Sequence, residues 1–335
     1  MKNNKNVLEV KDLKVHFDTE DGVIKAVDGI SFELKKGQTL GLVGESGCGK
    51  SLTSKTIIGI NPKTSKAKGK IIYHDSEAKT STDLISLPKN GPEIRAVRGG
   101  RISMIFQEPM TAFSPLYTIG NQIVESVLLH RTKDKVEAKK IAVEMMKKVG
   151  ISNAEKRYDQ YPMEFSGGMR QRAMIAMAMS CEPEVLIADE PTTALDVTIQ
   201  AQVLQLMNDL QKDLGMGILF ITHDLGVVAE MCDEIVVMYL GKAVEKGTAK
   251  DIFKAPKHPY TKGLLRSVPV LGDRSKEKLE SIEGTVPIPI NLPDRCGFYD
   301  RCEFAIKGTC DMKPVEITTL SETHQVRCFL YEKED

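Results

Sequence analysis

The 335-residue chain lacks an excess of charge of either sign, because its 46 lysines and arginines balance its 46 aspartates and glutamates. Nothing in that balance indicates a nucleic acid or an anionic membrane surface as a partner. No apolar run approaches the roughly 20 residues that a membrane-spanning helix needs. The start, MKNNKNVLEV, has no apolar signal-peptide core, and a strand-like pattern begins almost at once. We therefore expect a soluble protein of the cytoplasm.

The sequence also lacks internal repeats and low-complexity tracts, and its 7 cysteines fall into two groups. Cys48, Cys181 and Cys232 are scattered, whereas the other four crowd between Cys296 and Cys328. Disulfides are rare in the cytoplasm, so these residues are expected to be free thiols or metal ligands.

Hydrophobic periodicity divides the chain into an α/β body and a C-terminal extension. Strand-like alternation dominates the first part, helical spacing follows, and strand and helix then alternate. This order predicts α/β architecture with a helical insertion after Gln107, over about 108–180. Beyond Val268 the prolines become dense and the periodicity fades. We therefore expect two domains, residues 1–268 and residues 269–335.

One stretch matches a phosphate-binding loop at every constrained position. GESGCGKS, residues 44–51, fits G-x-x-x-x-G-K-[ST] between a buried-strand pattern and a helical pattern. Glycines let successive backbone N–H groups converge on phosphate oxygens, where the helix N-terminus adds partial positive charge. Lys50 is then expected to reach the β- and γ-phosphates, and Ser51 to take one position on Mg²⁺. The predicted nucleotide-binding residues of this loop are Gly44, Glu45, Ser46, Gly47, Cys48, Gly49, Lys50, Ser51 and Leu52.

A second nucleotide-binding element is predicted at VLIADE, residues 185–190. Its four apolar residues indicate a buried parallel strand, whose carboxyl end brings Asp189 and Glu190 to the phosphate side of the sheet. Asp189 suits a water-mediated contact with Mg²⁺, while Glu190 can orient the attacking water and accept its proton. Without a phosphate loop in the same chain, the pattern would indicate only an ordinary strand end.

These elements occur in an order that resembles the ATPase subunits of ABC transporters, over about residues 7–268. After the phosphate loop come Gln107 in MIFQEPM, the signature FSGGM at 165–169, and VLIADE; TALD at 193–196 and His223 in ITHD follow. The resemblance implies an ABC-type P-loop nucleotide-binding domain with a helical subdomain. It also implies that the chain binds ATP and Mg²⁺ and hydrolyses the ATP.

The resemblance implies a role for single residues as well. Gln107 would sense Mg²⁺ and the attacking water, and His223 would contact the γ-phosphate, although an isolated ITHD would favour a core histidine. Phe17 lies where the family stacks an aromatic ring on adenine, and the DTEDGV stretch after it loosens that alignment. Asp196 would help to couple two sites. The implied catalytic residues are Glu190, His223, Gln107 and Lys50, and those directed toward Mg²⁺ are Ser51, Gln107 and Asp189.

The signature implies a shared active site. Ser166, Gly167 and Gly168 are expected to open a helix whose amides and hydroxyl grip a γ-phosphate. In this family that phosphate belongs to the ATP of a partner subunit, so that two chains close around two nucleotides. Met169 stands where glutamine is common, with Gln171 two residues on. The Ser-Gly-Gly donors remain, so activity is still expected.

A narrower resemblance concerns the transported substrate. FQEPMTAFSPL, FSGGMRQRAMIAMA, HPYTKGLL at 258–265 and the cysteine-bearing tail resemble the oligopeptide/dipeptide importer branch. Its members work at the cytoplasmic face of the membrane beneath two permeases, with an extracytoplasmic substrate-binding protein and usually a second, non-identical ATPase. Peptides are therefore the expected cargo, and nickel and oligosaccharides are the alternatives within the branch. A soluble ABC ATPase outside transport would usually show coiled coils or two cassettes, which this chain lacks.

The tail cysteines Cys296, Cys302, Cys310 and Cys328 are spaced C-x5-C-x7-C-x17-C. This spacing is wider than that of the usual zinc pairs and differs from the ferredoxin runs. Alone it predicts only that four thiols bind one metal centre, with His324 as a possible spare ligand. The importer branch implies a small metal-binding extension with a four-iron, four-sulfur (4Fe–4S) cluster. We expect a structural role for it, because the tail has little apolar content and no second redox site is visible. Zinc and four free thiols remain the alternatives.

Overall fold

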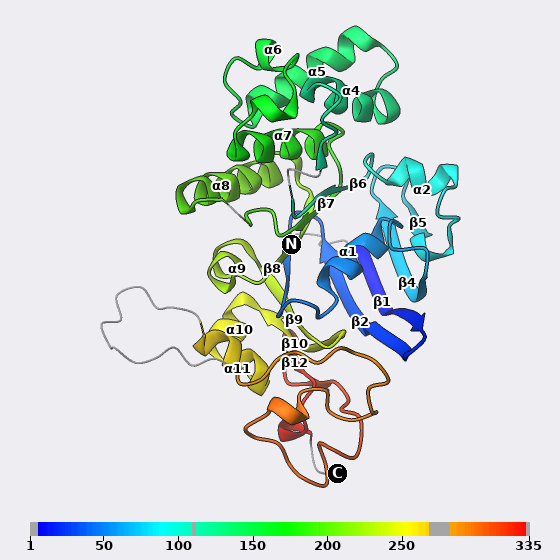
Figure 1. The fold of residues 1–335 in the computed structure, drawn as a ribbon, viewed down its shortest axis with the longest axis vertical. Helices are drawn as coiled ribbons and strands as arrows, with labels where there is room; N and C mark the ends of the chain where they lie inside the picture. Colours follow the sequence, from blue (N-terminus) through cyan, green and yellow to red (C-terminus); the bar gives the residue numbers. More distant parts are fainter. Residues whose placement is uncertain (1–5, 109–111, 194, 268–281, 333–335) are drawn as a thin grey trace.

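The computed structural model describes residues 6–108, 112–193, 195–267 and 282–332. Helices lie at one end of the long axis, two sheets in the middle and irregular C-terminal chain at the other end (Figure 1). This arrangement confirms the α/β architecture expected from the periodicity. The expected domain boundary at 268/269 and residues 109–111 of the helical insertion lie outside the described residues.

The N-terminal residues form a four-stranded antiparallel sheet of order β2-β1-β4-β5. β1 (Asn6–Thr19) and β2 (Gly22–Lys35) make a long hairpin, and β4 (Ser65–Asp75) and β5 (Thr80–Asp83) extend it. The inward-facing residues of these strands are buried, as the alternation of side chains along a strand requires.

The second sheet has eight strands, and its centre is parallel. β9 (Glu234–Tyr239), β3 (Thr39–Val43), β8 (Gly217–Thr222), β7 (Val185–Asp189) and β6 (Ile102–Ile105) run side by side in that order. Every residue of β3, β6, β7 and β8 is buried, as expected for parallel strands covered on both faces. The carboxyl ends of β3 and β7 therefore meet at one edge.

Helices and the small sheet cover the two faces of the parallel strands. α1 (Lys50–Ile57) and the small sheet bury one face, in a core that includes Leu42 and Ile187. α8 (Val197–Leu214) and α9 (Leu225–Met231) belong to the core on the other face.

The helical insertion forms the end of the molecule above the sheets (Figure 1). Its helices are α4 (Ile119–His130), α5 (Lys135–Lys148), α6 (Ala154–Arg157) and α7 (Gly167–Met179). Thr118, Asp134 and Ser166 cap three of them by accepting a backbone N–H, which satisfies donors that the first turn leaves free. Met174 and Met179 of α7 are fully buried, and they fill the core beneath this helix. The remaining short helices of this half are α2 (Pro92–Val97), η1 (Leu84–Ser86) and η2 (Pro162–Glu164).

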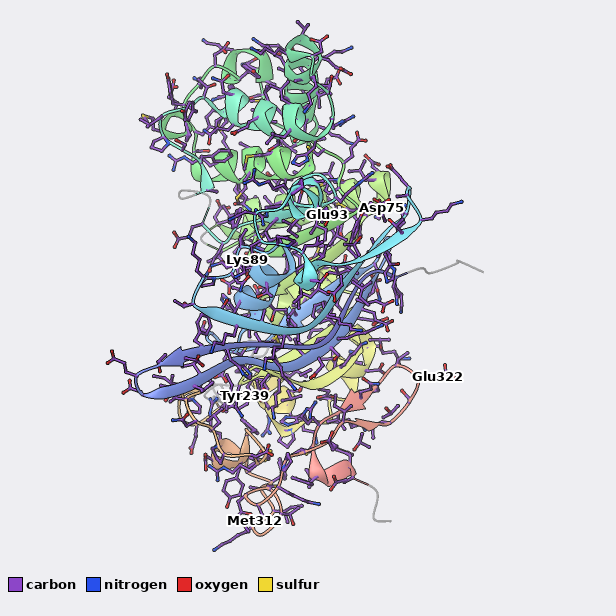
Figure 2. The ribbon with its side chains drawn as sticks, turned by 90° about the vertical axis from the view of Figure 1, so that its right-hand side faces the viewer. Asp75, Lys89, Glu93, Tyr239, Met312 and Glu322 are labelled. Atoms are coloured by element: carbon purple, nitrogen blue, oxygen red, sulfur yellow. The ribbon has the colours of Figure 1, made fainter. Side chains whose placement is uncertain are left out.

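The C-terminal residues fold back onto the large sheet. β10 (Lys242–Thr248) is antiparallel to β9, and β12 (Gln325–Val326) and β11 (Thr318–Thr319) continue the sheet beyond it. α10 (Ala249–Lys254) and α11 (Pro259–Arg266) follow β10. The last short helices are η3 (Tyr299–Arg301) and η4 (Phe329–Tyr331). In Figure 2 Tyr239 lies where the sheet meets this C-terminal chain and Met312 lies at its far end.

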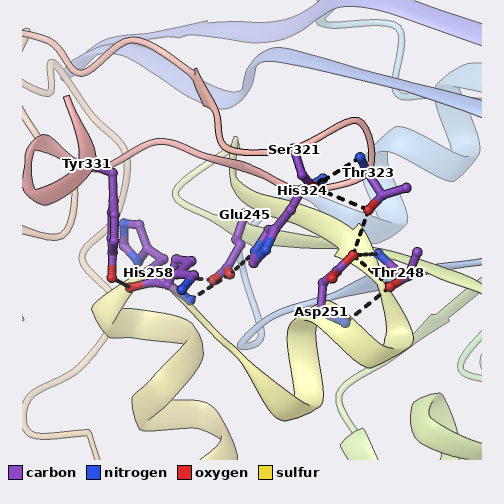
Figure 3. A network of polar contacts seen from close by, with 9 residues as sticks. Glu245, Thr248, Asp251, His258, Ser321, Thr323, His324 and Tyr331 are labelled. Carbon is purple, nitrogen blue, oxygen red and sulfur yellow. Dashed lines mark hydrogen bonds and ion pairs between the residues drawn. The ribbon is translucent and has the colours of Figure 1, made fainter. Parts of the chain in front are cut away.

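A buried carboxylate joins the C-terminal chain to the sheet. Glu245 of β10 accepts hydrogen bonds from the Lys257 and His258 N–H groups, and its Oε1 lies 2.7 Å from Nε2 of His324 (Figure 3). Both Glu245 and His324 are buried, so the contact gives the His324 ring a polar partner away from water. His324 is thereby assigned to this contact, where the sequence had suggested a spare metal ligand.

The helices of the described ranges include none that is long and apolar enough to cross a membrane.

Candidate functional site

The phosphate loop lies between the end of β3 and the start of α1. Gly44 and Gly49 adopt φ values of 151° and 101°. A Cβ on Gly44 would come 2.3 Å from the Met238 carbonyl oxygen, and one on Gly49 would come 2.3 Å from that of Ala26. Only glycine fits these two positions, which explains the constrained spacing of the motif.

The lysine of the loop is folded onto the loop's own backbone. The Lys50 ammonium donates to the Gly44 carbonyl at 2.7 Å and to the Glu45 carbonyl at 3.1 Å. Cys48 is buried beneath the loop, whereas Ser46 and Gly47 are exposed at its rim. Ser51 and Leu52 are half-buried in the first turn of α1. The residues predicted to bind a phosphate therefore lie on one turn of backbone around the buried ammonium group of Lys50.

Two hydroxyls of α1 meet the carboxylate at the end of β7. Ser51 Oγ donates to Asp189 Oδ1 at 3.0 Å, and Ser54 Oγ donates to Asp189 Oδ2 at 3.3 Å. Burial raises the pKa of Asp189, and the two hydroxyls act against that rise. Ser54 is a partner that the sequence did not predict; its position one helical turn after Ser51 was the available signal.

Three side chains converge on Glu190. Gln107 Nε2 and Thr193 Oγ1 donate to Glu190 Oε2 at 2.9 and 3.0 Å, and His223 Nδ1 lies 3.1 Å from Glu190 Oε1. Glu190 itself is buried, while Gln107 and His223 are exposed. Its backbone adopts φ 49°, a costly conformation for a residue other than glycine. The structure thus brings together Gln107, Glu190 and His223, which the sequence predicted separately as catalytic residues. Thr193 is an additional contact of Glu190.

The signature residues lie apart from the phosphate loop, at the N-terminus of α7 in the helical layer (Figure 1). Ser166 and Gly167 are exposed, and a Cβ on Gly167 would meet nothing. Ser166 Oγ accepts the Met169 N–H at 3.4 Å. Gln171, buried in α7, donates to the Pro191 carbonyl, so this helix contacts the segment that follows Glu190.

Two predicted residues have structural roles that the geometry defines. Phe17 of β1 pairs with Ile24 of β2 and packs, half-buried, against the core between the sheets. Asp196 caps α8 by accepting the Ile199 N–H at 3.0 Å. Ala194 of the TALD motif lies outside the described residues. The expected contacts of Phe17 with adenine and of Asp196 with a second site remain predictions.

The four tail cysteines are near one another and partly or fully buried. The pKa of Cys302 and that of Cys328 are raised to about 11, mainly by burial and in part by the neighbouring tail thiols. The Ile306 N–H donates to Cys310 Sγ at 3.3 Å, and the Cys296 N–H donates to the Cys310 carbonyl at 3.0 Å. Across the described residues, however, no group of three or more His, Cys, Asp or Glu side chains is arranged to hold a metal ion. The predicted metal-binding extension is therefore not supported by the geometry.

Comparison with known proteins places the chain among transport ATPases. Residues 27–193 match the family described as ABC transporter, and residues 244–310 match the family described as oligopeptide/dipeptide transporter, C-terminal region. The chain is 50% identical to the oligopeptide transport ATP-binding protein AppD of Bacillus subtilis, over 98% of each chain. It is 47% identical to the dipeptide transport ATP-binding protein DppD of the same organism, over 98% of this chain and 95% of that one.

The fold also matches a solved ATP-binding cassette. The dimeric bacterial ABC transporter cassette MJ0796 aligns with a TM-score of 0.63 at 23% identity, over 72% of this chain and 98% of that one. At this identity the likeness shows the fold alone.

Proposed function

Because the chain belongs to the ABC transporter ATP-binding subunits of the oligopeptide/dipeptide importer type, we propose that it binds and hydrolyses ATP to energise the import of short peptides. The observation that carries this proposal is the convergence of Gln107, Thr193 and His223 on Glu190, beside the Ser51–Asp189 pair. Both arrangements lie at the carboxyl end of β7, next to the phosphate loop. That edge of a parallel sheet is where ligands bind in open α/β folds.

The residues divide the work of hydrolysis between them. The backbone N–H groups of the phosphate loop and the ammonium of Lys50 bind the phosphates and offset their charge. Glu190 accepts the proton of the attacking water, and Gln107 and His223 hold its carboxylate and face the γ-phosphate. The hydroxyl of Ser51 and the carboxylate of Asp189 form a hard oxygen donor set of the kind that suits Mg²⁺ beside nucleotide phosphates. When bound, the ion neutralises charge that develops on the phosphates.

Replacement of Glu190 by glutamine tests this proposal. Glu190→Gln removes the proton acceptor and leaves Lys50, Ser51 and Asp189 in place, so ATP binding is expected to persist. Turnover is expected to fall by roughly 10²–10⁴, the usual contribution of a general base. Glu182→Gln is a matched control, because Glu182 has the same φ of 49° and pairs with Arg131 away from the site. Near-normal turnover of Glu190→Gln in the assembled transporter would remove this residue from catalysis.

We infer that the active unit contains two ATPase subunits. Ser166 and Gly167 are exposed at the start of α7, in a different part of the fold from β3 and α1, which flank the phosphate loop; this suits contact with the γ-phosphate of a partner's nucleotide. A helix N-terminus with free N–H groups favours such an anion. The partner is proposed to be a second, non-identical ATPase, with Asp196 helping to couple the two sites and Phe17 stacking on adenine.

We further propose that the chain works peripherally at the cytoplasmic face, beneath two membrane permeases served by an extracytoplasmic substrate-binding protein. Large apolar side chains that lie exposed on the helical insertion support a permease contact. Leu116 is 79% exposed, and Tyr117, Tyr161 and Met163 are exposed nearby in the sequence or on the same subdomain. Peptides are the proposed cargo, because the chain's relatives are named for oligopeptide and dipeptide transport. Nickel or an oligosaccharide is the alternative.

For the C-terminal residues 269–335 we propose a small domain organised by its four cysteines, beside an ATPase domain at 1–268 with its helical subdomain at about 108–180. The described side chains are not arranged to hold a single metal ion, and the proposal is supported by two other observations: the tail thiols lie near enough to raise the pKa of Cys328, and backbone amides hydrogen-bond to their sulfurs. Cys296, Cys302, Cys310 and Cys328 would hold a 4Fe–4S cluster, which is larger than a single ion and keeps its thiolates further apart. The group would act as a structural staple for a segment poor in apolar residues.

A further inference from the structure

Three groups of Glu45 in the phosphate loop, its N–H, its carbonyl and its carboxylate, each contact another side chain. Its backbone N–H donates to the Tyr260 hydroxyl at 2.8 Å, and its carbonyl accepts the Lys50 ammonium at 3.1 Å. Its carboxylate is bound by Arg301, which lies 256 residues further along the chain. Glu45 therefore joins the loop to α11 and, through Arg301, to the C-terminal extension.

The Arg301 contact has the geometry of a strong ion pair. Nη1 donates to Glu45 Oε2 at 2.8 Å and Nη2 donates to Oε1 at 3.1 Å, so the guanidinium grips both carboxylate oxygens. The Arg301 side chain is only 6% exposed, while that of Glu45 is 30% exposed. The Nε of Arg301 also donates to the Glu283 carbonyl at 2.9 Å. Burial and this second anchor leave the guanidinium little freedom to move.

Aromatic packing fixes the position from which Arg301 and Tyr260 reach the loop. Phe298 packs edge-on against Tyr239 and Tyr260, with ring centroids 5.2 and 5.4 Å apart. The Arg301 N–H donates to the Phe298 carbonyl at 3.1 Å, so η3 starts directly from this cluster. Two of the tail cysteines, Cys296 and Cys302, flank the same turn. The aromatic cluster thus fixes the position of η3, and with it the position of Arg301.

We propose that Arg301 is a positioning residue for ATP binding, which holds the phosphate loop in its nucleotide-binding shape through Glu45. When Lys50 turns from the Glu45 carbonyl to a phosphate, Tyr260 and Arg301 are the side chains that still restrain Glu45. The loop is then ordered before ATP arrives, and ordering in the free protein raises affinity. This inference rests on the proposed function, because it concerns the same nucleotide site.

The test measures the ATP dissociation constant and the turnover of the full-length chain with Mg²⁺. Arg301→Ala is expected to raise the dissociation constant roughly ten-fold, the scale of one such contact, and to leave turnover at saturating ATP within about two-fold, since Glu190 and its partners are untouched. Arg301→Lys keeps the charge but loses the guanidinium group that contacts both carboxylate oxygens. The ATP affinity of this variant is therefore expected to lie between those of the wild type and Arg301→Ala. Arg295→Ala is the control, because Arg295 belongs to the same extension and pairs with Asp300.

Glu45→Ala and the double variant separate positioning from a general loss of the extension's fold. Glu45→Ala keeps the bonds from Arg301 to the Glu283 and Gly284 carbonyls, so the extension is expected to stay folded. It should weaken ATP binding as much as Arg301→Ala, and the double variant should be no weaker than either. Unchanged affinity in Arg301→Ala, or effects that add in the double variant, would overturn the inference. Failure of the wild-type chain to bind ATP would instead reject the proposed function.

Discussion

Glu190 is the residue whose surroundings define the chemistry most clearly. Its Oε2 accepts from both Gln107 and Thr193, and its Oε1 faces His223, so every side-chain contact needs an acceptor oxygen. A glutamine in this place has one oxygen, and its NH₂ would face a donor. The Glu190→Gln change therefore removes the proposed proton acceptor and weakens the contacts that orient this side chain.

His258 allows a prediction about pH at the same scale. Burial lowers its pKa from the ordinary 6.5 to about 3, so the folded protein keeps this ring neutral. In the unfolded chain the ring takes up a proton below about pH 6.5, and stability is lost as the pH falls. Between pH 6.5 and 5 this site should lower the free energy of unfolding by up to about 1.4 kcal/mol per pH unit.

Urea unfolding at pH 7, 6 and 5 measures this effect against His258→Asn. Asparagine can still cap α11 by accepting the Tyr260 N–H, which His258 Nδ1 now accepts at 3.0 Å. The variant should lose less stability than the wild type on going from pH 7 to pH 5. Equal losses in the two proteins would show that His258 is protonated in the folded state.

Among the elements, the start of α7 carries the prediction of a shared site. Gly168→Asp places a carboxylate where a partner's γ-phosphate is proposed to bind, so ATP-driven dimer closure should be impaired. ATP binding at the chain's own phosphate loop should persist. Nucleotide titration measures that binding, and size-exclusion chromatography with ATP measures dimer closure. Gly168→Ala is the control. Its Cβ makes the same close contact with Ile199 Cγ2, at 3.1 Å, but adds no charge. If Gly168→Asp closes and hydrolyses normally with its partner, the shared site is wrong.

The C-terminal extension carries the prediction of a metal centre. Protein purified without oxygen should be brown, absorb broadly in the visible blue and contain about four irons per chain. Cys302→Ser should bleach the colour and make the tail more sensitive to protease, because the proposed cluster would hold the fold of this segment. Cys181→Ser, which changes a buried cysteine of the α/β body, should do neither. One zinc per chain, or four thiols that titrate freely, would contradict the iron–sulfur proposal.

For the whole molecule, the sequence predicted those features that depend on local pattern. The buried strands at 39–43 and 185–189 follow from apolar runs, and the structure confirms them. The phosphate loop could be predicted because Gly44 and Gly49 are sterically required. Contacts between distant segments have no such local pattern.

The contacts of Arg301 with Glu45 and of Gln171 with Pro191 are of this second kind. Each depends on where the fold brings two separate elements, and the motifs that contain Glu45 and Gln171 say nothing of their distant partners. The same limit applies to the tail, whose strands β11 and β12 join the large sheet although their sequence shows no strand periodicity.

The most direct test of the account is peptide uptake by the assembled importer. This chain, its permeases and partner ATPase would be placed in vesicles with ATP on the side of the ATPases and binding protein loaded with a labelled peptide on the other. The account predicts peptide uptake that requires ATP, hydrolysis that the loaded binding protein stimulates, and loss of both with Glu190→Gln. Hydrolysis that no peptide stimulates, or uptake of nickel or an oligosaccharide in place of peptide, would contradict it.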